Sequence, residues 1–139
     1  MGTRSTTRIY LSPGELTELD REDSVVIYRQ MDGYLSGHGK QLAEFLQDFV
    51  VVNGIPFSPQ GKIANGMSCL AAQIVAHFKF GVGNIYLHTS SAEEEEYNYI
   101  VYFDQHEGIV LGVYPGRDVL LFLGTPGEYL EKLQSGLIE

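Results

Sequence analysis

The sequence predicts an α+β fold, in which an antiparallel sheet of about five strands carries two main helices and a short C-terminal helix follows. Apolar residues in two segments recur with the period of a helix. From Asn84 onward the period changes to that of a strand, and four strand-like runs follow one another. The short separators between these runs favour antiparallel neighbours, and therefore a C-terminal four-stranded meander.

Composition limits the class of protein. The 139 residues are expected to form a single domain, 1–139, because no repeat, linker or change of composition divides them. The 18 acidic and 9 basic residues give a formal net charge of −9, which repels the phosphate backbone of nucleic acids. Cys69 is the single cysteine, and no apolar stretch is long enough for a signal peptide or a membrane span. We therefore expect a cytoplasmic protein that binds neither membranes nor nucleic-acid polymers.

The N-terminal segment is predicted to contain two short strands and a short helix. Residues 1–7 are polar and rich in Ser and Thr, so we expect them to be disordered. A short strand starts at residues 9–11. The segment 12–15 has the pattern of a capping box with Pro at the first helical position, which predicts a short helix to about Leu19. The β-branched and aromatic residues 25–28 are typical of a buried strand.

Two amphipathic helices are predicted for the middle of the chain. Apolar residues spaced i, i+3, i+4, i+7 and i+8 define the first, namely Leu42, Phe45, Leu46, Phe49 and Val50. Asn53-Gly54 supplies a left-handed stop for it, and residues 55–66 are expected to form a loop because they contain two prolines. The second helix is predicted over residues 67–78, with Asn65 or Ser68 as its cap.

The four strand-like runs are residues 85–89, 97–103, 109–114 and 119–123. The first run mixes polar and apolar residues, so we expect it at an edge of the sheet, whereas the last has no polar alternation and is expected to be central. The acidic residues 93–96 are interpreted as a solvated hairpin between the first two runs. The segment 125–128 repeats the capping-box pattern and predicts a closing helix through Leu133.

The segment 28–40 is the candidate for a functional site, because glycines, a turn dipeptide and ionisable side chains occur together there. The candidate ligand-binding residues are Arg29, Asp32, Tyr34, Gly37, His38, Gly39 and Lys40. The spacing does not fit a P-loop, since Tyr34 stands where the first glycine is required. A looser anion site at the helix start, with His38, Lys40 and the amides near Gly39 as donors, is one interpretation. The other is that the glycines only serve a tight strand-to-helix turn.

Catalytic and metal sites have weaker support in the sequence. Asp32 and His38 could meet as an acid–base pair, which leaves a small hydrolase as an alternative function. No Ser or Cys lies near them in a nucleophile-elbow pattern, so no catalytic residue is assigned. The remaining histidines lack the spacing of a metal site, and the carboxylates of 93–96 lack the ligand pattern of a calcium loop. We expect no metal and no cofactor.

Residues 28–46 resemble a group of small uncharacterised proteins from bacteria, phages and prophages. The matching residues are Tyr28-Arg29, Asp32-Gly33-Tyr34, Gly37-His38-Gly39 and Leu42-Ala43-Glu44-Phe45-Leu46. Those proteins carry a strand, an Asp-Gly-Tyr-Pro turn, a Gly-His-Gly or similar pair and a Leu-Ala-x-Phe-Leu helix. Here Met31 replaces the usual aromatic residue and Leu35 the usual proline. The resemblance implies a small soluble protein of a mobile element, where accessory roles include blocking a host enzyme or sequestering a host signalling nucleotide.

These observations favour a non-enzymatic binding protein that holds a small anionic or nucleotide ligand at residues 29–40. An acidic protein-interaction or inhibitor module that docks on a host protein is the first alternative. A small hydrolase using Asp32 and His38 is the second. A homodimer or higher homo-oligomer is also expected, because residues 84–89 form a candidate sheet edge with little charge, beside an aromatic-rich strand.

Overall fold

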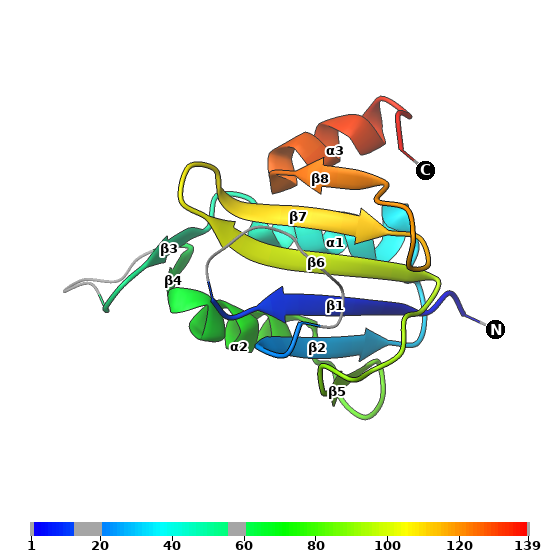
Figure 1. The fold of residues 1–139 in the computed structure, drawn as a ribbon, viewed down its shortest axis with the longest axis horizontal. Coiled ribbons are helices and arrows are strands. Elements are labelled where there is room, and N and C mark those ends of the chain that lie inside the picture. Colours follow the sequence, from blue (N-terminus) through cyan, green and yellow to red (C-terminus); the bar gives the residue numbers. More distant parts are fainter. Residues whose placement is uncertain (1, 13–20, 56–60, 139) are drawn as a thin grey trace.

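The computed structural model describes residues 2–12, 21–55 and 61–138 and has the α+β architecture that the sequence predicts (Figure 1). Its main sheet has the order β5 (Ile85–His88), β2 (Ser24–Arg29), β1 (Ser5–Tyr10), β6 (Tyr97–Asp104), β7 (Gly108–Tyr114) and β8 (Phe122–Gly124). Neighbouring strands are antiparallel except β1 and β6, which are parallel. Helices α1 (Lys40–Leu46) and α2 (Gly66–Phe78) lie behind this sheet in Figure 1, and α3 (Pro126–Gln134) packs against α1 beside β8.

The smaller elements connect these layers. A π-helical turn, η1 (Leu35–Gly39), leads directly into α1, and the parallel strands β3 (Val50–Val52) and β4 (Ile63–Asn65) form a separate two-stranded sheet. The main core fills the space between the large sheet and the helices. A second cluster lies on the opposite face, because successive side chains of a strand alternate: Ile9 belongs to the main core and Tyr10 to the second cluster. Within the described ranges, no helix is long and apolar enough to cross a membrane.

The N-terminal residues correct one expectation. Residues 5–7 were expected to be disordered, but they belong to β1, which lies in the interior of the sheet and is buried along its whole length. Their hydroxyl groups explain how a polar segment is tolerated there. Thr6 Oγ1 donates to Asn98 Oδ1 at 2.7 Å, and Thr7 Oγ1 lies 2.7 Å from His38 Nε2. These buried polar groups therefore have partners supplied by distant parts of the chain.

The strand order corrects further expectations about the sheet and its connections. The meander contains three strands, β6, β7 and β8, whereas β5 pairs with β2 at the far edge of the sheet. The edge position expected for β5 is thus confirmed, but the central position expected for the last run is wrong, since β8 forms the opposite edge. The segment 89–96 is not a hairpin. It crosses the sheet from β5 to β6, and its length is sufficient to pass over β2 and β1.

Local signals placed some element ends well and others poorly. Helix α2 has the predicted extent, and α3 starts with the predicted capping box, in which Thr125 and Glu128 exchange bonds of 2.8 and 3.2 Å. Helix α1 ends at Leu46, before the expected Asn-Gly stop, because Gln47 leaves the helical conformation, with ψ 133°, and Asp48 follows with a left-handed φ of 68°. Strand β4 lies inside the expected loop 55–66. The helix expected over residues 12–19 lies outside the described residues.

Candidate functional site

The candidate segment leaves the sheet at the end of β2 and turns back towards the helices. Asp32 takes a left-handed conformation with φ 62°, which short polar residues tolerate better than most. Two backbone bonds fix this turn: His38 N–H donates to the Asp32 carbonyl at 2.7 Å, and Gly33 N–H donates to the Thr3 carbonyl at 2.9 Å. The turn is therefore tied both to itself and to the chain just before β1.

Gly37 and Gly39 serve close packing. Neither has a positive φ, so the left-handed region is not what selects glycine here. A methyl group at Gly39 would overlap the Tyr129 hydroxyl and the Tyr99 ring, and one at Gly37 would overlap the Asp32 carbonyl. The two tyrosines hold the turn, because their hydroxyls donate to the carbonyls of Gly33 and Leu35 at 2.7 Å. Burial raises the pKa of both tyrosines, which keeps the hydroxyls protonated as donors.

His38 lies inside the protein and is only 1% exposed. Its Nδ1 lies 3.1 Å from Arg29 Nη1 and its Nε2 lies 2.7 Å from Thr7 Oγ1. Since a guanidinium can only donate, Nδ1 accepts, and Nε2 carries the proton that is donated to Thr7. Burial, followed by the charge of Arg29, lowers the pKa of His38 to about 3. The ring is therefore neutral at physiological pH.

Arg29 is held by the same turn. Its side chain is 12% exposed, and its Nε donates to the Met31 carbonyl at 2.8 Å. Its Nη1 donates to Gln41 Oε1 at 2.8 Å as well as to His38. Its Nη2 lies 3.9 Å from Asp32 Oδ2, too far for a hydrogen bond. The guanidinium is thus fixed through Nε and Nη1, whereas Nη2 forms only a long ion pair with Asp32.

A cavity of about 300 Å³ lies beside this guanidinium. It is lined by Arg29, Gln30, Met31, Asp32 and Asn84. Asn84 comes from the start of the β5 region and has φ 66°, while the other four residues leave the end of β2. The cavity therefore combines one cation, one carboxylate, two amides and an apolar side chain.

The predicted site residues separate into three groups. Arg29 and Asp32 line the cavity, while Gly37, His38 and Gly39 are buried and support the turn from inside. Tyr34 and Lys40 are exposed and do not line it. The backbone amides expected to receive an anion already donate within the turn: those of Gly37 and Gly39 to the Tyr34 carbonyl, and that of Lys40 to the Gly37 carbonyl.

The geometry gives no support to an acid–base pair of Asp32 and His38. The contact between these residues is a backbone hydrogen bond, and the ring nitrogens of His38 are occupied by Thr7 and Arg29. A general base must reach the proton that it removes, and this ring is enclosed by Phe78 and Tyr99, with centroid distances of 5.0 and 5.3 Å. Among the described residues, no group of three or more His, Cys, Asp or Glu side chains could hold a metal ion.

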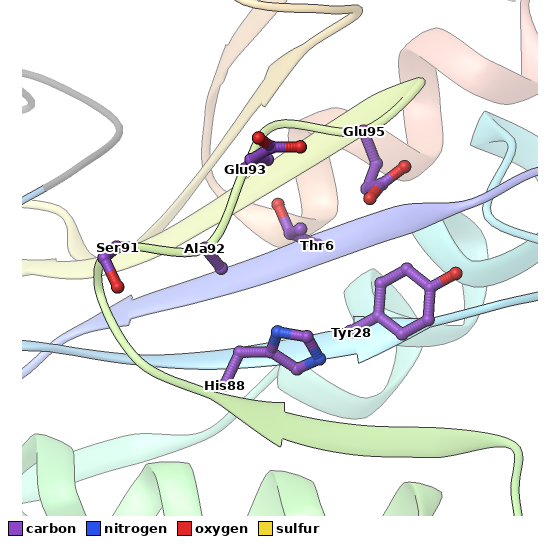
Figure 2. A pocket seen from close by; sticks show the side chains of 7 residues that line it. All are labelled: Thr6, Tyr28, His88, Ser91, Ala92, Glu93 and Glu95. Atoms are coloured by element: carbon purple, nitrogen blue, oxygen red, sulfur yellow. The ribbon is translucent and has the colours of Figure 1, made fainter.

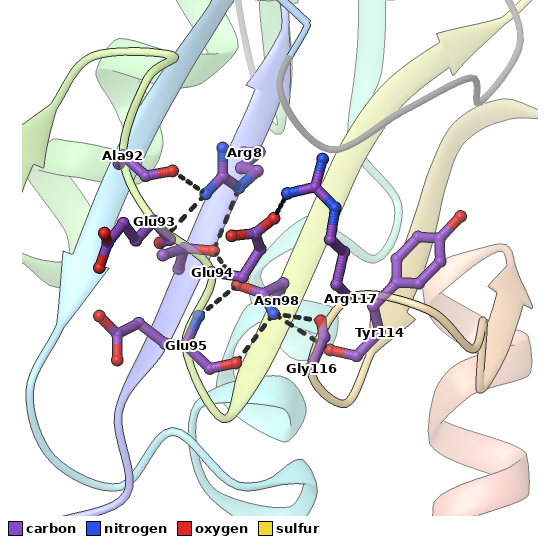
Figure 3. A network of polar contacts seen from close by, with 10 residues as sticks. Arg8, Ala92, Glu93, Glu94, Glu95, Asn98, Tyr114, Gly116 and Arg117 are labelled. Carbon is purple, nitrogen blue, oxygen red and sulfur yellow. Dashed lines mark hydrogen bonds and ion pairs between the residues drawn. The ribbon is translucent and has the colours of Figure 1, made fainter.

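A polar network on the opposite face of the sheet was missed by sequence reasoning (Figure 3). Arg8 is 1% exposed, and its Nη2 donates to the carbonyls of Ala92 and Glu93 at 2.8 and 3.3 Å. Asn98 is bonded to both the N–H and the carbonyl of Glu95 at 3.0 Å. These two buried side chains hold the crossing segment 89–96 on the sheet. The available signal was an arginine flanked by the strand-forming residues of β1.

A second cavity of about 380 Å³ lies beneath this crossing segment (Figure 2). Thr6, Tyr28 and His88 contribute from the sheet, and Glu93 and Glu95 from the segment above it. The rings of Tyr28 and His88 lie 5.5 Å apart. The carboxylates of Glu93 and Glu95 make this cavity unfavourable for an anion.

No family model, no curated protein and no solved structure matches this chain. The resemblance of residues 28–46 to small bacterial and phage proteins therefore stays a prediction.

Proposed function

We propose that this chain is a non-enzymatic binding protein that holds the anionic group of a small ligand at Arg29. The observation that carries the proposal is a nearly buried guanidinium, fixed by Met31, His38 and Gln41, with one edge at a cavity of about 300 Å³. A cation whose orientation is set before binding loses little conformational entropy when an anion arrives. Arginine also offers paired donors that suit carboxylate and phosphate groups.

The neutral state of His38 supports this assignment. A histidine that accepts from Arg29 orients the guanidinium without cancelling its charge, whereas a carboxylate in the same place would neutralise it. The carboxylate of Asp32 lies 3.9 Å from Arg29 Nη2, but the Asp32 side chain is 57% exposed, so water screens its effect on the charge of Arg29. Much of the charge of Arg29 is thus available to a ligand.

A phosphorylated ligand such as a nucleotide signal is one candidate, and the resemblance to mobile-element proteins suggests sequestration as its purpose. Gln30 and Asn84 would add neutral amide donors or acceptors at the cavity wall. Asp32 would oppose a highly charged anion, so a ligand with a single negative group is favoured.

A thermal-shift panel of nucleotides, cyclic nucleotides, carboxylates and inorganic phosphate tests the proposal. A ligand at 100 times its Kd stabilises the folded state by about 2.7 kcal/mol. We expect Arg29→Gln to lose this stabilisation, while Lys40→Gln, which removes the same charge from an exposed position outside the cavity, keeps it. An absence of any shift with anionic ligands, or an equal loss in both variants, would reject the assignment to Arg29.

A protein-interaction module is the second candidate, and the β5 edge is the observation that favours it. Phe80 is 84% exposed, Val82 105%, Leu87 64% and Tyr86 44%. Apolar side chains that gather at the surface of a monomer commonly mark a contact with another protein. Docking of a second copy at this edge is compatible with anion binding at Arg29, and its test is given in the Discussion.

A further inference from the structure

We infer that the ligand of the Arg29 cavity is a zwitterion of the α-amino acid type, whose anionic group meets Arg29 and whose ammonium group meets Asp32. This inference rests on the proposed function and narrows its ligand class. It starts from the two opposite charges that line the same cavity, since Arg29 Nη2 and Asp32 Oδ2 are 3.9 Å apart.

At this separation the two groups form no hydrogen bond with each other. A charge-assisted hydrogen bond between nitrogen and oxygen has a length of about 2.7–2.9 Å, and the Arg29–Asp32 contact is longer by roughly 1 Å. A simple anion placed at Nη2 would approach the Asp32 carboxylate closely and be repelled by it. A ligand with an ammonium group next to its carboxylate replaces that repulsion by a second ion pair.

The backbone keeps Asp32 in place although its side chain is largely exposed. Its left-handed conformation, with φ 62°, and its carbonyl bond to His38 N–H at 2.7 Å fix where the carboxylate leaves the chain. Arg29 is fixed by three hydrogen bonds, one from Nε and two from Nη1. Arg29 and Asp32 therefore present opposite charges 3.9 Å apart. An α-amino acid also carries its ammonium and carboxylate groups close together, so each could contact the residue of opposite charge.

The rest of the lining suits the same class of ligand. Met31 is 59% exposed and presents an apolar surface to a ligand side chain. Asn84 Oδ1 accepts from Phe80 N–H at 3.2 Å, which leaves the other end of the amide as a neutral donor at the wall. A volume of about 300 Å³ is at the low end for ligand sites and suits a ligand of amino-acid size.

Calorimetric titration of the intact chain with matched probes tests the inference. The twenty common amino acids are screened first, and the tightest is compared with its des-amino acid and its decarboxylated amine. We expect the amino acid to bind at least tenfold more tightly than either analogue. In Asp32→Asn, where asparagine tolerates the same backbone conformation, we expect the amino acid to lose at least fivefold and the des-amino acid to bind as well or better.

Asp48→Asn is the matched control, because Asp48 is also exposed and left-handed, with φ 68°, but does not line this cavity. It should leave every affinity unchanged. If the des-amino acid or inorganic phosphate binds more tightly than any amino acid and gains affinity in Asp32→Asn, the zwitterion is rejected while anion binding at Arg29 stands. If no probe binds, or if Arg29→Gln changes nothing, both the inference and the proposed function fail.

Discussion

His38 links folding to pH, because its pKa of about 3 in the folded chain lies below its ordinary value of 6.5. Between these two values the unfolded chain binds a proton that the folded chain does not. The stability supplied by the neutral ring is therefore complete above pH 6.5 and is lost as the pH falls towards 3. A protonated ring would also lose its acceptor bond from Arg29.

We expect His38→Gln to be less sensitive to acid than the wild type, since an amide can accept from Arg29 and donate to Thr7 without titrating. Urea denaturation at pH 7 and pH 4 measures this. The wild type should lose on the order of 2 kcal/mol more than the variant over that interval. Equal losses in the two proteins would show that another group dominates the acid response.

Gly39 allows two tyrosines to approach the turn, and adding a methyl group there should be costly. We expect Gly39→Ala to lower the free energy of unfolding by about 2–4 kcal/mol, because the new Cβ overlaps the Tyr129 hydroxyl and the Tyr99 ring. Adding Tyr129→Phe should make the same change less costly, as a double-mutant cycle would detect. Gly127→Ala is the control, since the nearest atom to its Cβ would be at 3.7 Å, and it should be close to neutral. An additive cycle would contradict the close approach.

The crossing segment 89–96 shows how one buried side chain fixes an element. Two carbonyls of this segment accept from Arg8, which lies on β1 beneath it. Other bonds to the segment come from Asn98 to Glu95, from Gly116 N–H to the Glu96 carbonyl at 3.1 Å, and from the ion pair of Glu94 with Arg117. This segment connects β5 to β6 across the two strands that lie between them, β2 and β1.

We expect Arg8→Met to destabilise the protein by about 1–3 kcal/mol, because it removes the buried guanidinium that donates to the partly buried carbonyls of Ala92 and Glu93. Amide hydrogen exchange should accelerate mainly in residues 89–96. Arg117→Met is the control, because Arg117 also contacts this segment, through an ion pair with Glu94. The Arg117 side chain is 56% exposed, so this ion pair should contribute less than about 1 kcal/mol. Uniform acceleration across the sheet, or equal effects of the two variants, would contradict a local clamp.

The β5 edge of the main sheet combines a partly occupied backbone edge with exposed apolar side chains. At the β5 end, Lys79 Nζ donates to the carbonyls of Gly83 and Ile85 at 2.8 and 3.0 Å, which occupies part of the strand edge. A lysine placed in this way discourages pairing with another strand. Association there would therefore be carried by the exposed side chains of Phe80, Val82 and Leu87 more than by backbone hydrogen bonds.

We expect a homodimer or higher homo-oligomer that forms through this edge. Light scattering coupled to size exclusion should give a mass above 15.5 kDa that rises with concentration in the micromolar range. Leu87→Lys should reduce the mass to that of one chain, whereas Leu137→Lys, at a 70% exposed position after α3, should not. A mass of 15.5 kDa at every concentration would reject the dimer and weaken the interaction module.

Local chemistry accounts for what the sequence predicted correctly about the fold. The helical period of α2, the capping box of α3 and the β-branched and aromatic runs of β6 and β7 involve residues within a few positions of one another. The pairing of strands, in contrast, joins residues that are far apart in the sequence. In the interior strand β1, the hydroxyls of Thr6 and Thr7 are bonded to Asn98 and His38, which lie far away in the sequence, and the segment between β5 and β6 is held by Arg8.

For the candidate site, the sequence by itself indicated the segment 28–40, since unusual glycines and charges within one short connection are visible without a structure. The direction in which each side chain points was decided by the packing of the whole chain. Tyr99 and Tyr129 donate to the carbonyls of Gly33 and Leu35, respectively, and Thr7 Oγ1 is bonded to Nε2 of His38. Arg29 and Asp32 remain at the cavity because burying an unpaired charge is costly, and no pattern within the segment could show which groups would find partners.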